Sequence, residues 1–293
     1  MNRRLKSLLL VSFLLSRAVV GQAAPPRLIV RGDDMGAAHA INEAIMKCHQ
    51  DGIQTSIEVI VPSPWFPEAV AMLAADSRVD VGVHLALTSE WDNVKWRPVS
   101  DCPSLRDADG YFFPMIHSNK NYPKGALSEH DWRLADIEKE FRAQIQLAIK
   151  RIPRVSHLSG HMGCDRISPE VRSLVKTLAN EYHLAIWPEE LGVKGVRYIG
   201  PHSTPEEKVE SFMKMLNSLE DDNTYLFVDH PGLDTPEMRA IHHIGYENVA
   251  TDRQGVTTAW CDPRVRQLLE SRRIQLIGYK DLKKTPSEKA TAR

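Results

Sequence analysis

The chain has 293 residues, of which 42% are hydrophobic and 26% are charged, and its formal net charge is -1. This near balance of charge argues against a nucleic-acid-binding protein, which would usually be strongly basic. The ordinary apolar fraction argues against a disordered chain, and the length allows one large domain or two small ones.

The first residues have the organisation of a secretory signal peptide. A basic segment, Asn2 to Lys6, precedes a short apolar run, Ser7 to Leu15, and small residues follow up to Ala23. The apolar run is well short of the roughly 20 residues that cross a bilayer, which disfavours the alternative of a membrane anchor. We therefore expect a signal peptide over 1–23, cleavage near Ala23, and a secreted or periplasmic protein with no membrane span in the mature chain.

Segments with strand and helix patterns alternate through the rest of the chain. The expected strands cover residues 27–31, 56–61, 79–87, 155–158, 185–187, 224–228 and 274–279. The expected helices cover residues 38–51, 66–75, 132–152, 169–181, 204–219 and 262–271. A loop is expected at 32–36, a long irregular segment at 88–127, and a solvated tail at 283–293.

Repeated strand–loop–helix units are typical of a parallel sheet with crossover helices. We predict one catalytic domain over residues 27–282, an α/β fold with a single TIM-like (β/α) barrel that is distorted or incomplete. Polar residues at or just past the ends of the expected strands favour a barrel, because all its strand ends converge on one face. A doubly wound sheet would offer a crevice at only one point. These polar residues are Asp33, Asp34, His84, His161 and His230.

The paired carboxylates Asp33 and Asp34 repel each other unless a cation or a proton relieves the repulsion. One of them could bind a metal ion while the other handles protons; the alternative is that either one caps the following helix. His84 lies in an otherwise apolar strand, where a single histidine is more often a core residue than a ligand. Of His157 and His161, the second is better placed as a ligand because it lies in a loop, and His157 is left as a supporting or structural residue.

Imidazole and carboxylate ligands suit one divalent ion, with zinc and magnesium as the first choices and manganese or cobalt as alternatives. A bound ion would lower the pKa of water and polarise a carbonyl group. Asp33 could then act as general base, and His230, oriented by Asp229, could protonate a leaving amine. The alternative for His230 is a turn with a solvent-facing side chain.

The chain resembles the YdjC-like carbohydrate deacetylases, which include diacetylchitooligosaccharide deacetylases and hopanoid-biosynthesis-associated relatives. The resemblance extends from Leu28 to about Leu282. Its main motifs are Arg31–Gly36, similar to N-A-D-D-F-G; Gly82–Thr88, similar to G-L-H-L-x-L-T; His157–His161, similar to H-L-D-S-H; and His230–Gly232, which matches H-P-G. Residues 42–45 and 52–56 are similar to the family's N-x-G-I and G-I-V-T-S.

This resemblance implies a distorted TIM-like barrel and hydrolysis of an N-acetyl group on a sugar or oligosaccharide. It implies that Asp34, His84 and His161 bind the metal and that Asp33 is the base. Ser159 stands where the family has the acid of H-L-D-S-H, and Arg31-Gly32 stands before the acidic pair in place of Asn-Ala. These departures leave the ligand positions unchanged and bear on the substrate and on the groups around the metal.

Several alternatives stay open from the sequence. Trp91 and Trp96 could stack on sugar rings or could pack the long irregular segment against the barrel. The function could instead be that of a metallo-esterase or amidohydrolase, or of a secreted carbohydrate-binding protein without catalysis. The oligomeric state is open, with a homodimer among the alternatives. Four cysteines, either free or in disulfides, complete the candidates: Cys48, Cys102, Cys164 and Cys261.

Overall fold

The computed structural model of the chain describes residues 23–185 and 187–282. Nearly all of the expected signal peptide and the whole of the expected tail lie outside the described residues, so the division into leader, domain and tail stays a prediction. Within the described ranges, no helix has both the length and the apolar character needed to cross a membrane.

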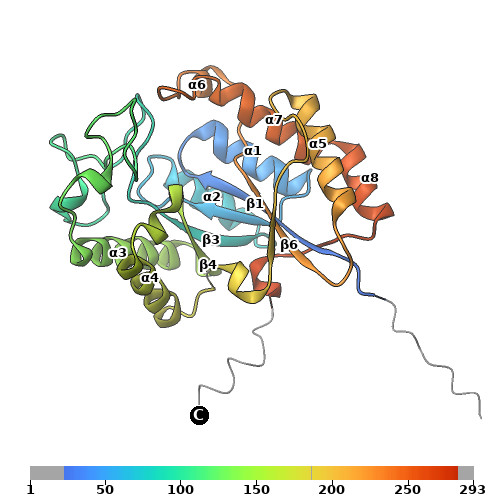
Figure 1. Ribbon diagram of the computed structural model, residues 1–293, viewed down its shortest axis with the longest axis horizontal. Helices are drawn as coiled ribbons and strands as arrows, with labels where there is room; N and C mark the ends of the chain where they lie inside the picture. Colours follow the sequence, from blue (N-terminus) through green and yellow to red (C-terminus); the bar gives the residue numbers. More distant parts are fainter. Residues whose placement is uncertain (1–22, 186, 283–293) are drawn as a thin grey trace, which may run out of the picture.

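A seven-stranded sheet in which every pairing is parallel forms the centre of the protein (Figure 1). The order is β4-β3-β2-β1-β6-β5, and β7 pairs with the start of β1. The strands are β1 (Arg27–Met35), β2 (Ser56–Val59), β3 (Asp80–Leu85), β4 (Val155–Gly160), β5 (Lys194–Val196), β6 (Thr224–Asp229) and β7 (Gln275–Leu276). The described strands β4 and β5 do not pair with each other, so the sheet is not closed. This confirms the predicted α/β barrel in its incomplete form.

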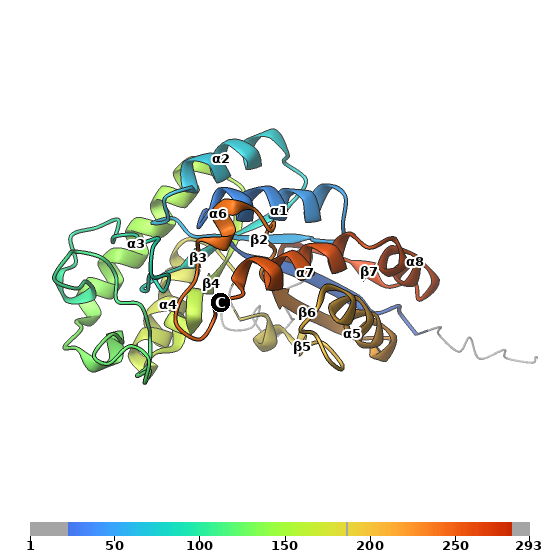
Figure 2. The ribbon, with the colours of Figure 1, turned by 90° about the horizontal axis from the view of Figure 1, so that it is seen from above.

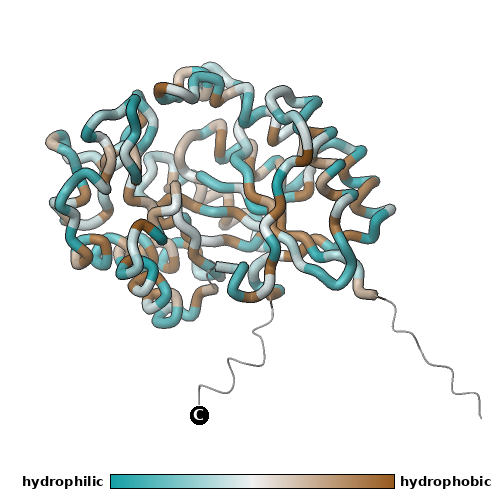
Figure 3. Tube along the Cα trace, viewed as in Figure 1, coloured by the Kyte–Doolittle hydropathy of each residue, from teal (hydrophilic) through white to brown (hydrophobic). Residues whose placement is uncertain are grey.

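Helices surround the outside of the sheet (Figures 1 and 2). They are α1 (His39–Gln50), α2 (Phe66–Ala75), α3 (Leu134–Arg151), α4 (Pro169–Glu181), α5 (Pro205–Ser218), α6 (Pro236–Arg239), α7 (Val249–Cys261) and α8 (Pro263–Ser271). Hydrophobic and hydrophilic residues alternate along α5 and α8, as expected for helices with one buried face (Figure 3).

The two faces of the sheet differ in polarity. Successive residues of a strand point to opposite faces. In β2, Ile57 and Val59 belong to the hydrophobic core that residues of α1 and α2 share. Ser56 and Glu58 point the other way and both contact His157 of β4. The outer face of the sheet is therefore apolar, and the inner face carries polar side chains.

Most expected elements agree with the structure, and two helices, α2 and α4, have the expected bounds. Several features differ. The first strand continues through the expected loop to Met35, and β5, α6 and α7 were not expected. Of the strand expected at 185–187, Ala185 makes one bridge to His157, Ile186 lies outside the described residues, and Trp187 precedes a short 3-10 helix. All four cysteines are free thiols in this structure.

The helix α7 could not be predicted from the sequence because it is buried on more than one face. Its buried residues include Val256, Ala259 and Trp260, but also Arg253 and Thr257. No apolar stripe at helical spacing results, and such a stripe is the signal on which helix prediction depends. The helix carries a residue of the functional site, described below.

We expect Trp260→Ala to lower the free energy of unfolding by about 3–5 kcal/mol, because it empties a fully buried site of the core. Trp65→Ala is the control, since Trp65 is 38% exposed and its truncation should cost no more than about 1 kcal/mol. Urea denaturation of both variants measures the difference. Equal costs would contradict the packing of α7 described here.

Candidate metal centre

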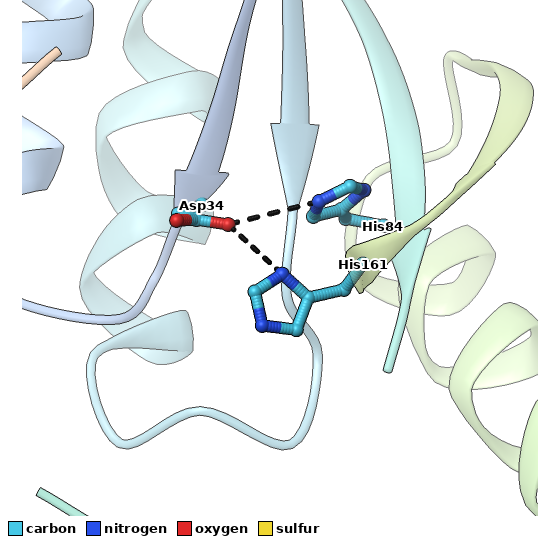
Figure 4. Close-up of side chains that lie close together, drawn as sticks. All are labelled: Asp34, His84 and His161. Carbon is cyan, nitrogen blue, oxygen red and sulfur yellow. Dashed lines mark ion pairs between the residues drawn. The ribbon is translucent and has the colours of Figure 1, made fainter. Parts of the chain in front are cut away.

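Asp34, His84 and His161 come together at the carboxyl ends of their strands (Figure 4). Asp34 lies near the end of β1, His84 lies on β3, and His161 directly follows β4. One potential ligand atom from each residue lies within 4.8 Å of the others, and all three side chains are buried. The structure thus brings together the three residues that the sequence analysis selected as ligands, in the position where barrels of this kind carry active sites.

A β-bulge in β1 turns both adjacent carboxylates toward the centre. Adjacent strand residues normally point to opposite faces. Here the register of β1 against β2 shifts between Gly32 and Met35, and Asp34 has a φ of 73°, which an aspartate tolerates better than most residues. As a result, the Nε2 atom of His84 lies 3.6 Å from an oxygen of Asp33 and 3.6 Å from an oxygen of Asp34.

The two oxygens of Asp34 have different surroundings. Oδ2 accepts a hydrogen bond of 2.8 Å from Nη2 of Arg253, a residue of α7. Oδ1 lies 3.2 Å from Nδ1 of His161 and 3.6 Å from Nε2 of His84. Neither ring has the alignment of a hydrogen bond, so Oδ1 is a buried atom without a hydrogen-bond partner among the described residues. Such an atom costs about 1–3 kcal/mol unless another group satisfies it.

A carboxylate orients His161. Its Nε2 atom lies 3.0 Å from Oε2 of the buried Glu90, a distance suited to a hydrogen bond in which Nε2–H donates. In the neutral ring, Nδ1 then carries the lone pair, and this atom faces Oδ1 of Asp34. Two electron-pair donors that face each other in a buried site fit a cation between them. The residues present therefore fit a divalent metal ion, held by Asp34, His84 and His161.

The electrostatics of the cluster also favour positive charge at its centre. Burial opposes the charged form of His161, but the carboxylates of Glu90 and Asp34 raise the pKa of this histidine to about 10. Without a metal ion the ring is therefore protonated at neutral pH, and a metal ion would bind in place of the proton on Nδ1. Burial likewise opposes ionisation of Asp34, yet Arg253, His230 and His161 hold the pKa of Asp34 well below its usual range. Asp34 is therefore ionised at neutral pH, as a metal ligand must be.

Asp33 is paired with Arg31, which holds it in place. Nε and Nη2 of Arg31 donate to the two oxygens of Asp33 at 2.8 and 2.9 Å, and Nη1 donates to the hydroxyl of Tyr279 at 3.0 Å. The residue that caps α1 is Ala38, and no side chain accepts the cap hydrogen bond. The structure therefore gives no support to the alternative in which Asp33 or Asp34 caps this helix.

His230 lies beside the cluster rather than in it. Its Nε2 atom is 4.0 Å from Oδ2 of Asp34, and its side chain is 39% exposed. Its backbone N–H donates to Oδ1 of Asp229 at 2.9 Å, while the hydroxyl of Tyr198 donates to Oδ2 of Asp229 at 2.7 Å. Burial opposes the charged ring, but Asp34 and Asp229 raise the pKa of His230. His230 therefore has the access to solvent and the basicity that a proton donor at the rim requires.

Three residues next to the ligands were missed by sequence analysis: Glu58, Glu90 and Arg253. A signal existed for Glu58, which is the only charged residue in a short apolar strand. None existed for Arg253, because α7 itself was not expected. His157 is completely buried, contacts Glu58 and stacks on Tyr279 with ring centroids 3.7 Å apart. His157 is thus a supporting residue beneath the centre.

Trp91 and Trp96 are buried, with exposed fractions of 2% and 3%. The ring of Trp91 lies under the guanidinium of Arg253, at 5.2 Å, and Nε1 of Trp96 donates to the backbone carbonyl of Thr88 at 2.8 Å. Neither tryptophan presents an open ring face, so these positions favour the packing alternative over sugar stacking.

An incomplete parallel α/β barrel with an Asp-His-His cluster at its strand ends defines a class of protein, the α/β barrel with a candidate metal centre at the active-site face. Within that class, the chain belongs to the YdjC-like protein family, whose family model matches residues 27–271. This confirms the family resemblance drawn from the motifs.

The chain is similar to proteins of several bacteria. It is 33% identical over 238 residues to a carbohydrate deacetylase of Thermus thermophilus, covering 73% of this chain and 80% of that protein. It is 27% identical over 268 residues to carbohydrate deacetylase 2 of Listeria innocua, covering 88% and 99%. The fold is similar to a crystal structure of an Enterococcus faecalis protein named for cellobiose-phosphate cleavage, with a TM-score of 0.69, 20% identity, and coverage of 89% of this chain and 100% of that one.

The buried pair of Glu58 and His157 predicts a specific loss of stability in acid. Burial raises the pKa of Glu58, but His157 and Arg31 outweigh burial and bring it to about 2, below its ordinary value of 4.5. A depressed acid pKa stabilises the fold above pH 4.5 and loses this effect as the pH falls toward 2. Glu58→Gln should cost about 3–5 kcal/mol at pH 7. Urea denaturation should show the gap to wild type shrinking below pH 4.5, and a pH-independent gap would contradict the assignment.

Proposed function

We propose that this protein is a divalent-metal-dependent carbohydrate deacetylase that hydrolyses the N-acetyl group of an amino sugar or oligosaccharide. The observation that carries the proposal is the buried Oδ1 of Asp34, which has no hydrogen-bond partner in the described part of the chain and faces nitrogen atoms of His84 and His161. The names of the relatives from Thermus and Listeria support the reaction class.

Different residues of the site take the roles of metal ligand and general base. Asp34, His84 and His161 would hold the ion, which when bound lowers the pKa of water and polarises the acetyl carbonyl. Zinc and magnesium are the first choices, with manganese and cobalt as alternatives. Asp33 accepts the proton of the attacking water, because two nitrogen atoms of Arg31 orient its carboxylate and it lies as close to His84 as Asp34 does.

His230 supplies a proton to the leaving amine. Its ring is half-exposed and lies on the Oδ2 side of Asp34, opposite the free oxygen. Asp229 and Tyr198 form a hydrogen-bonded pair behind it. The amide C–N bond breaks as water adds to the acetyl carbon, so the products are acetate and the free amino sugar.

We also propose that the protein is exported, on the strength of the basic and apolar segments before Ala23. An exported deacetylase would act on a glycan outside the cytoplasm.

Asp33→Asn tests the division of roles. We expect this variant to bind metal and fold like the wild type but to lose at least about 100-fold in turnover, because an amide cannot accept the proton. Acetate release and metal content measured on the same preparation provide the check. Turnover equal to that of the parent would make the proposed mechanism wrong.

Acetate release from a panel of N-acetylated and O-acetylated glycans, with and without a chelator, tests the reaction class. We expect release from an N-acetylated sugar that stops when the metal is removed and returns when zinc or another divalent ion is added. Release from O-acetylated substrates alone would favour the metallo-esterase alternative. Binding of the sugars without release of acetate would favour the carbohydrate-binding alternative.

A further inference from the structure

We propose that Glu58 is a positioning residue for His84: acting through the hydroxyl of Ser159, it fixes the ring form of His84 that presents an unprotonated Nε2 to the metal. This inference rests on the metal site proposed above and adds residues to it that bind neither metal nor substrate.

The hydrogen bonds run in one direction from the ring to the carboxylate. Nδ1 of His84 lies 2.7 Å from Oγ of Ser159, and the same Oγ donates to Oε2 of Glu58 in a short hydrogen bond. A hydroxyl has only one proton to donate, and a carboxylate only accepts. Because the hydroxyl of Ser159 donates its proton to Glu58, the oxygen of Ser159 must accept a hydrogen bond from Nδ1–H of His84. Nε2 of His84 is then left with the lone pair, and this atom points at Asp33 and Asp34.

Glu58 is itself held from its other side. Its Oε1 accepts a short hydrogen bond from Nε2 of His157, and both side chains are fully buried. The ring of His157 is fixed by its stacking on Tyr279. Glu58 therefore has no freedom to turn away from Ser159.

The strand between these groups leaves room for the contact. Gly82 of β3 lies between Glu58 and His157, and a Cβ atom there would come within 2.4 Å of Oε2 of Glu58 and of Nε2 of His157. Only a glycine permits the carboxylate and the imidazole to meet across β3. The arrangement is thus built by β2, β3 and β4 together.

The two histidines of the site are supported differently. His161 reaches the carboxylate of Glu90 directly, whereas His84 reaches that of Glu58 through one hydroxyl. A carboxylate or carbonyl behind a metal-binding histidine sets the ring form and raises its basicity, and loss of such a partner typically lowers metal affinity about 10- to 100-fold.

Glu58→Gln tests the inference because it reverses the hydrogen bonds. The amide of glutamine can donate to Ser159, which frees the serine proton for Nδ1 of His84 and places the ring proton on Nε2, where the metal should bind. We expect the affinity for zinc, measured by competition with a chromophoric chelator, to fall about 10- to 100-fold. Nitrogen NMR of the metal-free protein, with His84 assigned by His84→Gln, should show the proton on Nδ1 in the wild type and on Nε2 in Glu58→Gln.

Glu140→Gln is the matched control. Glu140 is another fully buried glutamate, on α3, where it accepts hydrogen bonds from the backbone of Val99 and Ser100. Its replacement should lower stability and leave zinc affinity unchanged. An equal fall in affinity in both variants would overturn the inference, because it would show a general effect of removing a buried carboxylate.

Ser159 provides a second test that leaves the contact between Glu58 and His157 in place. Ser159→Ala should lower zinc affinity about 10-fold, at the lower end of the range for a lost supporting partner, and Ser159→Thr, which keeps the hydroxyl, should restore it. If wild type binds zinc and Glu58→Gln and Ser159→Ala bind it equally well, Glu58 has no positioning role and the metal site stands. If wild type binds no divalent ion, the proposed metal site itself fails.

Discussion

Charged groups buried on the inner face of the sheet must be paired, because an isolated charge in a protein interior costs several kcal/mol or more. Each of three carboxylates at the centre has its own partner: Arg31 for Asp33, Arg253 for Asp34, and His157 for Glu58. Arg31 lies on β1 with Asp33, whereas Arg253 comes from α7 and His157 from β4, so the last two pairs tie together parts of the chain that are distant in sequence. The two hydrophobic clusters of the core pack the strands that carry these pairs against the surrounding helices.

The bulge in β1 allows the two adjacent carboxylates, Asp33 and Asp34, to take different roles in one site. It brings two neighbouring carboxylates to the same side of a strand, where they share the vicinity of His84. Their partners then make them different. Arg31 donates to both oxygens of Asp33, while Arg253 donates to one oxygen of Asp34, and the other oxygen has no hydrogen bond from any residue that the structure describes. Two residues of the same type thus become candidates for two roles, one as base and one as ligand, through their neighbours alone.

The alternating strands and helices can be predicted from the sequence because hydrophobic periodicity is local, and helices α2 and α4 have the expected bounds. The convergence of parallel strand ends also points to Asp33, Asp34, His84, His161 and His230 as a group. The family resemblance then implies that Asp34, His84 and His161 are the ligands. The residues that contact the ligand side chains from behind could not be predicted from the sequence. Glu90 and Arg253 meet the site through tertiary contacts, and Arg253 lies on a helix without an apolar stripe.

The bulge in β1 and the burial of Trp91 and Trp96 could also not be predicted from the sequence. A bulge depends on the hydrogen-bond register between two strands, and the residues of β1 alone do not specify that register. Whether Trp91 faces a sugar or the interior depends on what covers its ring, and here Arg253 from the other end of the chain does so.

The contact between Arg31 and Tyr279 joins residues that are 248 positions apart. Arg31 is among the first residues of the fold to leave the ribosome, and Tyr279 is among the last. Until the 3-10 helix Tyr279–Asp281 has been synthesised, one N–H group of Arg31 lacks its hydroxyl partner and His157 lacks the ring on which it stacks. The polar centre can therefore be completed only after translation has passed Tyr279, and an N-terminal fragment that ends before this residue would lack both contacts.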